Sequence, residues 1–426
     1  MGTLFFRLEQ RVFKSSVKRP NLRSALALYG LALAVFGLLA WPRLAARPPN
    51  EFVALAEAWL AGRLDIAPAL APYLDLAEFG GRYFVPYPPA AAMLYTPVVA
   101  LFGRGVYHGL LHLLLAAAIL PLFYLALTRY LGETGHSQRE QIWLAGLLAF
   151  GTPVAALGAS SNVYFTGQIV AVLFTCLYLL AAYRGRHPGW AGLALGAAFM
   201  ARGATLLGFP VILAEIWRTQ RGMTAGAQRA LLRFGLAVAA VLLLAAWYNW
   251  ARFGQPAEFG YQYLDWRADP VFVRWGLFDY VYLERNLHAL LTSLPVLLPS
   301  FPYVAYHPEG MSVLLTTPVL LLLPTLRDWT VTAKAALLSA GLILLPALFY
   351  ANTGFVQYGY RYAADFLPYL ILAMALAGLR VRTWPVKALI LVGMAVSLWG
   401  AWLAGWHPFD AELARLIEQH TLLRYR

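Results

Sequence analysis

Hydrophobic runs long enough to cross a membrane alternate with shorter polar segments along most of the chain. A helix rises about 1.5 Å per residue, so the core of a bilayer, about 30 Å thick, requires about 20 apolar residues. Allowing for helices that are somewhat shorter, the pattern predicts about 11 transmembrane helices. Their approximate bounds are residues 24–41, 106–128, 142–158, 164–183, 189–201, 204–217, 234–251, 311–326, 335–351, 363–379 and 387–405. The two runs on either side of Arg202 are short, and could form a broken or re-entrant hairpin.

Two further apolar stretches are too short to span a membrane. Residues 89–102 and 287–298 are therefore predicted to be helices that lie at the membrane surface or dip into it. The pattern as a whole predicts an all-α polytopic membrane protein that forms a single transmembrane domain, residues 1–426.

Composition supports a membrane protein, since 61% of the residues are hydrophobic and only 12% are charged. Soluble domains contain about 25% charged residues. The single cysteine, Cys176, excludes an internal disulfide. The charged segment before residues 25–41 is too long for a signal peptide, so we expect this apolar run to be a retained helix.

The charged residues are distributed unevenly between the two sides of the predicted helices. With a cytoplasmic N-terminus, the inner segments hold 19 of the 33 Lys and Arg residues. They hold only 5 of the 20 Asp and Glu residues, including Glu215 at the edge of one segment. Positive charge on the cytoplasmic side is typical of multi-pass proteins of the inner (plasma) membrane. The net charge of +13 is thus explained by topology and some attraction to anionic membrane lipid, and it does not indicate nucleic-acid binding.

Two long loops are predicted on the outer side, residues 42–105 with surface helices and residues 252–310. A short third loop covers residues 352–362, and all three are rich in Tyr, Phe and Trp. The inner loops are short by comparison, so the chemistry is expected at the outer face. We find no internal repeat, which disfavours an inverted-repeat transporter.

The first outer loop holds five carboxylates, Glu51, Glu57, Asp65, Asp75 and Glu78. Two prolines precede Asn50, which is a good N-cap, and Glu51 falls in the first helical turn, where the helix dipole favours an anion. An apolar stripe then predicts a surface helix that ends near Gly62. Glu51 and Glu57 should point to different faces of this helix. The simplest alternative is a surface helix whose acids are merely solvated.

The order Glu51, Ala56-Glu57, Leu60, Gly62 and Leu64-Asp65 resembles the first outer loop of GT-C glycosyltransferases. This superfamily includes protein O-mannosyltransferases and the bacterial transferase that adds aminoarabinose to lipid A. Four further segments resemble segments that recur in bacterial cell-envelope proteins of this class, residues 80–103, 249–261, 310–324 and 355–373. The resemblance implies a GT-C-like fold with Glu51 as the catalytic residue. Many members have an adjacent Asp-Glu pair at this point, whereas this chain has Asn50-Glu51.

The resemblance also implies a reaction. A sugar would move from a polyprenyl-phosphate donor to a glycan, lipid or protein acceptor, with inversion at the anomeric carbon. Such a reaction requires a base, a cation for the departing phosphate and aromatic surfaces for the sugar. The candidate cations are Arg361, Arg285 and Arg202, because guanidinium groups match phosphate. The candidates for substrate contacts are Glu57, Tyr83, Tyr87, Tyr358 and Asp365.

Several of these residues have a simpler structural explanation. Arg361 could be an interfacial arginine whose charge reaches water, or it could pair with Asp365 one helical turn later. Arg202 could be a structural plug between short helices. Asn162, Tyr164 and Gln168 could touch sugar hydroxyls, although helix capping and packing explain them more simply.

No cofactor is indicated with certainty. His108 and His112 share a helix face, but two ligands are too few for a metal site, and packing or hydrogen bonding is the preferred explanation. The acidic outer loop could hold a divalent metal, although no ligand spacing demands one. The chain has no nucleotide-binding motif, which favours a lipid-linked donor over a nucleotide sugar.

Two other classes of function remain open. A transporter or flippase of lipid-linked sugar should show several charges within the membrane, and only Arg202 and Asp365 come near this condition. A catalytically inactive GT-C scaffold would be consistent with the missing acid beside Glu51.

Overall fold

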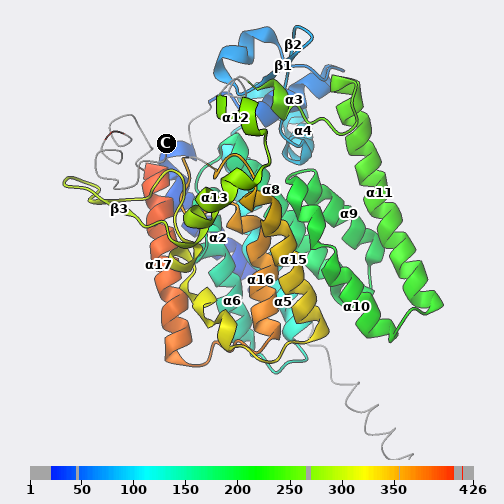
Figure 1. Ribbon diagram of the computed structural model, residues 1–426, viewed down its shortest axis with the longest axis vertical. Coiled ribbons are helices and arrows are strands. Elements are labelled where there is room, and N and C mark those ends of the chain that lie inside the picture. The colour runs from blue at the N-terminus through cyan, green and yellow to red at the C-terminus, as the bar shows by residue number, and fades with distance from the viewer. Residues whose placement is uncertain (1–20, 45–47, 265–269, 355, 407–414, 416–426) are drawn as a thin grey trace, which may run out of the picture.

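The computed structural model describes residues 21–44, 48–264, 270–354, 356–406 and 415. The N-terminal residues 1–20, which are predicted to be cytoplasmic, lie outside this part, as do residues 265–269 of the second outer loop. The described chain is mostly helical, and long helices pack side by side into a bundle (Figure 1). Short elements gather at one end of the bundle, at the top of Figure 1. We call this the loop end, and it is defined by α3 (Glu51–Leu60) and α4 (Ala90–Phe102).

Six described helices are long and apolar enough to cross a membrane, so the chain is a multi-pass membrane protein. They are α2 (Leu22–Leu44), α5 (His108–Leu131), α8 (Val163–Ala182), α11 (Ala225–Phe253), α15 (Val331–Leu348) and α17 (Trp384–Trp406). The prediction of about 11 spanning helices is therefore not confirmed by helix length.

The other apolar runs form shorter elements. They are α6 (Gln138–Phe150), α7 (Val154–Gly158), α9 (Pro188–Phe199), α10 (Pro210–Gln220), α14 (Val313–Thr316), η8 (Pro318–Thr325) and α16 (Ala363–Leu376). Prolines stand at or just before the first residue of α7, α9, α10 and η8, where they favour a helix start and prevent one continuous helix. Residues 200–209, which include η4 (Gly203–Gly208), separate α9 from α10. Because α9 has 12 residues and is about 18 Å long, the pair forms an interrupted hairpin with Arg202 at its tip.

The helix α16 lies inside the bundle, because every one of its residues is buried. It packs against α15, α8 and α5, whereas α11 lies at the edge of the bundle and is mostly exposed. An apolar helix that is buried on all sides belongs to the core, and one that exposes apolar residues faces lipid. The position of α16 places Arg361 and Asp365 centrally, at the loop end.

Two short β-hairpins accompany the helices, and the described chain remains mostly helical, as expected. Strands β1 (Ala77–Phe79) and β2 (Arg82–Phe84) form an antiparallel hairpin. Gly80 and Gly81, with φ of 59° and 71°, form its two-residue turn, and such turns require two residues with positive φ. A second small hairpin is formed by β3 (Val296–Leu297) and β4 (Val304–Ala305), where a surface helix was expected over part of the segment.

The remaining described elements are single turns and short helices. They are η1 (Pro68–Tyr73), η2 (Gly103–Gly105), η3 (Tyr183–Gly185), η5 (Tyr261–Tyr263), α12 (Pro270–Trp275), η7 (Tyr280–Tyr282) and α13 (Leu283–Leu291). The segments η1 and η5 come from the first and second predicted outer loops respectively, and they contact β2 and β1.

Tyr358 packs against α17 and its hydroxyl donates to the Val396 carbonyl, 2.8 Å away. A Cβ at Gly400 would overlap the Tyr358 ring. We expect Gly400→Ala to lower the free energy of unfolding by about 1–3 kcal/mol, because overpacking forces the ring and helix apart. Thermal unfolding in detergent measures this. Gly30→Ala in α2 is the matched control, since its added methyl group meets no atom and should leave stability unchanged or slightly higher.

Candidate functional site

Four segments of the chain converge at the loop end. They are the first turn of α3, the segment before β1, the first turn of α8 and the residues that lead into α16. Each contributes one polar side chain, namely Glu51, Asp75, Tyr164 and Arg361. A fifth segment, η5, adds Tyr261.

Glu51 is the first residue of α3, as the sequence predicts. The Asn50 side chain caps the helix by accepting from the backbone N–H groups of Phe52 (3.0 Å) and Val53 (3.2 Å). Glu51 is 9% exposed, and its Oε1 accepts from the backbone N–H of Asp75 at 3.3 Å. Burial raises the pKa of Glu51 to about 7, the two backbone hydrogen bonds lower it in part, and the charge of Asp75 raises it further. A carboxylate with a pKa near 7 can accept a proton efficiently at neutral pH.

Asp75 is a functional candidate that the sequence did not single out. Its Oδ2 accepts short hydrogen bonds from the hydroxyls of Tyr87 and Tyr164. The two hydroxyl oxygens are 3.0 Å apart and the two rings meet edge to face. Many GT-C members have a second acid directly before the one at the position of Glu51. In this chain the second carboxylate near Glu51 is Asp75, which lies 24 residues away in sequence. Tyr87, which was expected to contact substrate, faces this acid pair.

Arg361 is a buried cation for which the described residues provide no acidic partner. Its Nε donates to the Gly354 carbonyl at 2.8 Å and its Nη1 to Oε1 of Gln168 at 3.2 Å. The guanidinium carbon lies 5.5 Å from the ring centre of Tyr164 and 4.9 Å from that of Tyr362. A guanidinium group that is out of water and held only by neutral groups favours an anion.

Asp365 pairs with Arg202 and not with Arg361. Both Nε (3.1 Å) and Nη2 (3.0 Å) of Arg202 donate to Oδ2 of Asp365. The Arg202 guanidinium also lies over the ring of Tyr362, at 4.8 Å. Asp365 Oδ1 is buried and has no hydrogen-bond partner among the described residues. The charge of Arg202 is thus balanced by Asp365, whereas no carboxylate in the described part of the chain pairs with Arg361.

Tyr261 connects the acidic and basic halves of the site. It comes from the second predicted outer loop, and its ring centre lies 6.1 Å from that of Tyr87. Burial raises the pKa of Tyr261 to about 12, with the charges of Arg202 and Arg361 acting in the opposite direction and that of Asp75 in the same direction. One tyrosine hydroxyl is therefore within electrostatic range of both halves.

The other expected site residues make their hydrogen bonds, ion pairs and strand pairings with other partners. Glu57 pairs with Arg104 on another side of α3. Tyr83 is opposite Glu78 in the β1–β2 hairpin. Arg285 donates to the Ala351 carbonyl and lies over the ring of Tyr282. As described above, Tyr358 is directed toward α17.

The two histidines and the acids do not form a metal centre in the described part of the chain. His112 hydrogen-bonds to Thr166 Oγ1 (3.0 Å) and the Leu157 carbonyl (2.8 Å), which agrees with a role in helix packing. Among the described residues, no group of three or more His, Cys, Asp and Glu could hold a metal ion.

Comparisons with known proteins provide one structural likeness. No protein-family model matches the chain, and no curated protein sequence matches it. Among solved structures, it is similar to ArnT from Cupriavidus metallidurans bound to undecaprenyl phosphate, with a TM-score of 0.48 and 14% sequence identity. The match covers 87% of this chain and 62% of that chain, so this chain spans less than two thirds of that protein's length.

Proposed function

We propose that this protein is a GT-C-type glycosyltransferase of the inner membrane. It moves a sugar from a polyprenyl-phosphate donor to a glycan, lipid or protein acceptor at the outer face. One arrangement carries the proposal. Glu51, a carboxylate whose pKa burial raises to about 7, is linked through Tyr164 and Tyr261 to Arg361, a buried arginine that has no acidic partner among the described residues. This arrangement provides a proton acceptor and an anion site at one end of a membrane bundle.

The chemistry follows from these two groups. Glu51 accepts the proton from the acceptor hydroxyl as its oxygen bonds to the anomeric carbon. The bond between that carbon and the phosphate oxygen breaks, and its electron pair stays on the departing lipid phosphate. Arg361 is positioned to stabilise the added negative charge. Attack from the face opposite the phosphate inverts the anomeric carbon.

The surroundings suit an amphiphilic donor. The polyprenyl chain would remain in the hydrocarbon region beside the bundle, and the phosphate would sit at the loop end near Arg361. Tyr87, Tyr164 and Tyr261 provide aromatic faces and hydroxyl groups between the two ionic groups, where a sugar would lie. The distribution of basic residues along the sequence assigns the loop end to the outer side.

Asp75 acts in this proposal as a positioning residue. We expect Asp75→Asn to lower kcat by about tenfold to 100-fold and to move the acidic limb of the pH–rate profile to lower pH. The pH shift follows because the charge of Asp75 raises the pKa of Glu51, and the amide removes that charge. The pH dependence of kcat measures it. Asp65→Asn is the matched control, since Asp65 is in the same loop but its side chain lies near Arg63; an unmoved pH limb in Asp75→Asn would contradict this role.

The direct test uses the full chain reconstituted in liposomes with polyprenyl-phosphate sugars that carry a labelled sugar. A panel of sugars and of glycan, lipid and protein acceptors is screened for labelled product. Transfer that Glu51→Gln abolishes supports the proposal. Movement of the intact donor between leaflets without transfer would favour a flippase, and donor binding without turnover across the panel would favour an inactive scaffold.

A further inference from the structure

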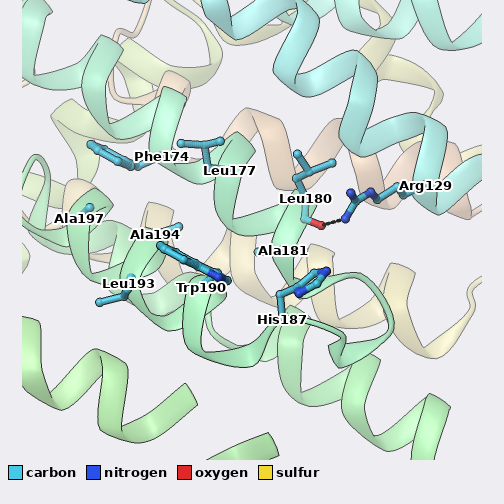
Figure 2. A pocket seen from close by; sticks show the side chains of 10 residues that line it. All are labelled: Arg129, Phe174, Leu177, Leu180, Ala181, His187, Trp190, Leu193, Ala194 and Ala197. Carbon is cyan, nitrogen blue, oxygen red and sulfur yellow. Dashed lines mark hydrogen bonds between the residues drawn. The ribbon is translucent and has the colours of Figure 1, made fainter. Parts of the chain in front are cut away.

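A groove of about 540 Å³ opens on the bundle between α8, α9 and the last turns of α5. Figure 2 shows Arg129 and His187 at one end of the groove and Phe174 and Ala197 at the other. The wall between them is apolar and includes Leu180, Trp190 and Leu193 among others. The volume lies within the range of about 300–1,000 Å³ that is usual for small-molecule sites.

This groove is separate from the candidate site. Tyr164 in the first turn of α8 belongs to that site, whereas Leu180 in the last turn of α8 lines the groove. Sixteen residues separate the two, or about 24 Å along the helix axis. The groove therefore lies toward the opposite membrane face, at which α5 and α8 end and α9 begins.

Small side chains explain why the groove exists. Helices α5 and α9 both pack against α8. Ala181 on α8, with Ala194 and Ala197 on α9, lines the space between them. A methyl group is too short to fill that space, so an elongated apolar hollow remains that opens toward the surrounding hydrocarbon.

The charge at the end of the groove is positive. Arg129 uses its Nη1 to donate to the Leu180 carbonyl, 2.8 Å away, and is only partly buried. His187 and its neighbour Arg186 are exposed. Among the described residues, no carboxylate lines the groove, and the nearby acid Glu133 pairs with Arg184 and lies 4.0 Å from Arg218. Trp190, at 70% exposure, adds an aromatic ring of the kind found at membrane interfaces.

We propose that this groove binds one anionic phospholipid of the cytoplasmic leaflet. An acyl chain lies along the apolar wall, and the phosphate meets Arg129 and the exposed edge of His187. Basic pockets between transmembrane helices on the cytoplasmic side are known to bind the head groups of anionic lipids. The occupant is a bulk membrane lipid and neither the sugar donor nor the acceptor, so the inference does not depend on the proposed reaction.

The test is native mass spectrometry of the full chain in detergent, titrated with phosphatidylglycerol or with phosphatidylcholine of the same acyl chains. We expect phosphatidylglycerol to bind at least tenfold more tightly. Arg129→Gln should reduce its affinity by about tenfold, because a hydrogen bond to a charged group is lost. Arg139→Gln, at an exposed arginine in the first turn of α6 at the same membrane face, is the matched control and should bind normally.

A second variant tests the apolar wall without altering charge. Ala194→Leu places a larger side chain in the groove and should reduce binding of phosphatidylglycerol by about tenfold. Thermal unfolding without added lipid confirms that each variant is folded. Equal binding of the two lipids, normal binding by both Arg129→Gln and Ala194→Leu, or displacement of the phospholipid by equimolar polyprenyl phosphate would overturn the assignment.

Discussion

A Glu51→Gln protein should lose sugar transfer by about 10³-fold and yet unfold at a higher temperature than the wild type at pH 8. The loss follows because a glutamine cannot accept the acceptor proton, and general base catalysis contributes about 10²–10⁴-fold. In the wild type, the rate should rise with pH through a midpoint near 7, where Glu51 releases its proton. Initial rates of transfer measured from pH 5 to 9 test both statements.

The gain in stability of the Glu51→Gln protein should grow as the pH rises. An acid whose pKa is raised on folding destabilises the protein at high pH, whereas an acid whose pKa is lowered by an ion pair stabilises it there. Because the pKa of Glu51 rises from 4.5 to about 7 on folding, the folded state holds the proton more tightly than the unfolded state. Stability is therefore lost as the pH rises from 4.5 toward 7. At about 1.4 kcal/mol per pKa unit the loss is about 3 kcal/mol, and the uncharged glutamine avoids it.

Thermal unfolding of the two proteins at pH 5 and pH 8 measures this difference. The variant should be more stable at pH 8, and most of the difference should disappear at pH 5. Glu57→Gln is the matched control: it lies on the same helix but pairs with Arg104, so it should give no gain in stability at pH 8. A Glu51→Gln protein that transfers sugar at the normal rate would remove Glu51 as the base.

Replacing Arg361 with lysine should lower kcat/KM for the lipid-linked donor by about 10²-fold. Lysine keeps the positive charge, but it lacks the planar donors that contact Gly354 and Gln168 and that would meet the phosphate. The loss of one preorganised donor to a developing anion commonly lowers the rate by about 10²–10³-fold. Steady-state kinetics with varied donor, together with binding of polyprenyl phosphate by native mass spectrometry, test the prediction.

Arg285→Lys provides the comparison for Arg361. Both arginines are candidates from the sequence, but Arg285 contacts Ala351 and Tyr282, whereas Arg361 lies beside Tyr164, the partner of Asp75. We therefore expect Arg285→Lys to leave donor binding within about threefold of the wild type. If Arg285→Lys lost donor binding and Arg361→Lys kept it, the phosphate would belong beside α13.

The local features of the site could be predicted from the sequence, because they depend on neighbouring residues. Two prolines and Asn50 set the start of α3, and this start places Glu51 in its first turn. The Asp75–Glu51 contact could not be predicted, because it bridges 24 residues through a backbone N–H group. Tyr164 was considered mainly as a capping or packing residue, since its partner Asp75 is 89 residues away.

The Arg361–Asp365 pair, considered as an alternative from the sequence, does not form, for a geometric reason. The i,i+4 rule applies to two residues on one helix, and α16 begins only at Ala363. Arg361 precedes the helix, so its side chain does not lie above that of Asp365. The tip of the α9–α10 hairpin instead brings Arg202 to Asp365 across 163 residues.

A segment can be hydrophobic because it is buried inside the protein and not because it contacts lipid. This explains why the sequence predicted about 11 spanning helices, whereas six described helices are long and apolar enough to cross a membrane. The run at 363–379 is apolar because α16, with 14 residues, is enclosed by other helices. The run at 142–158 contains Gly151 and Pro153, between α6 and α7. A hydrophobic segment alone does not distinguish lipid contact from protein contact.

The two carboxylates of the site are separated in sequence by α3 and by residues 61–74, a segment in which Ile66 alone is buried. Within it, none of the residues of η1 is buried. Exposed connections between fixed ends accept changes of sequence and length more readily than the elements that they join. The turn η1 is thus an exchangeable module: grafting or randomising it, with the buried Ile66 kept, offers a route to new acceptors while the chemistry at Glu51 and Asp75 is retained.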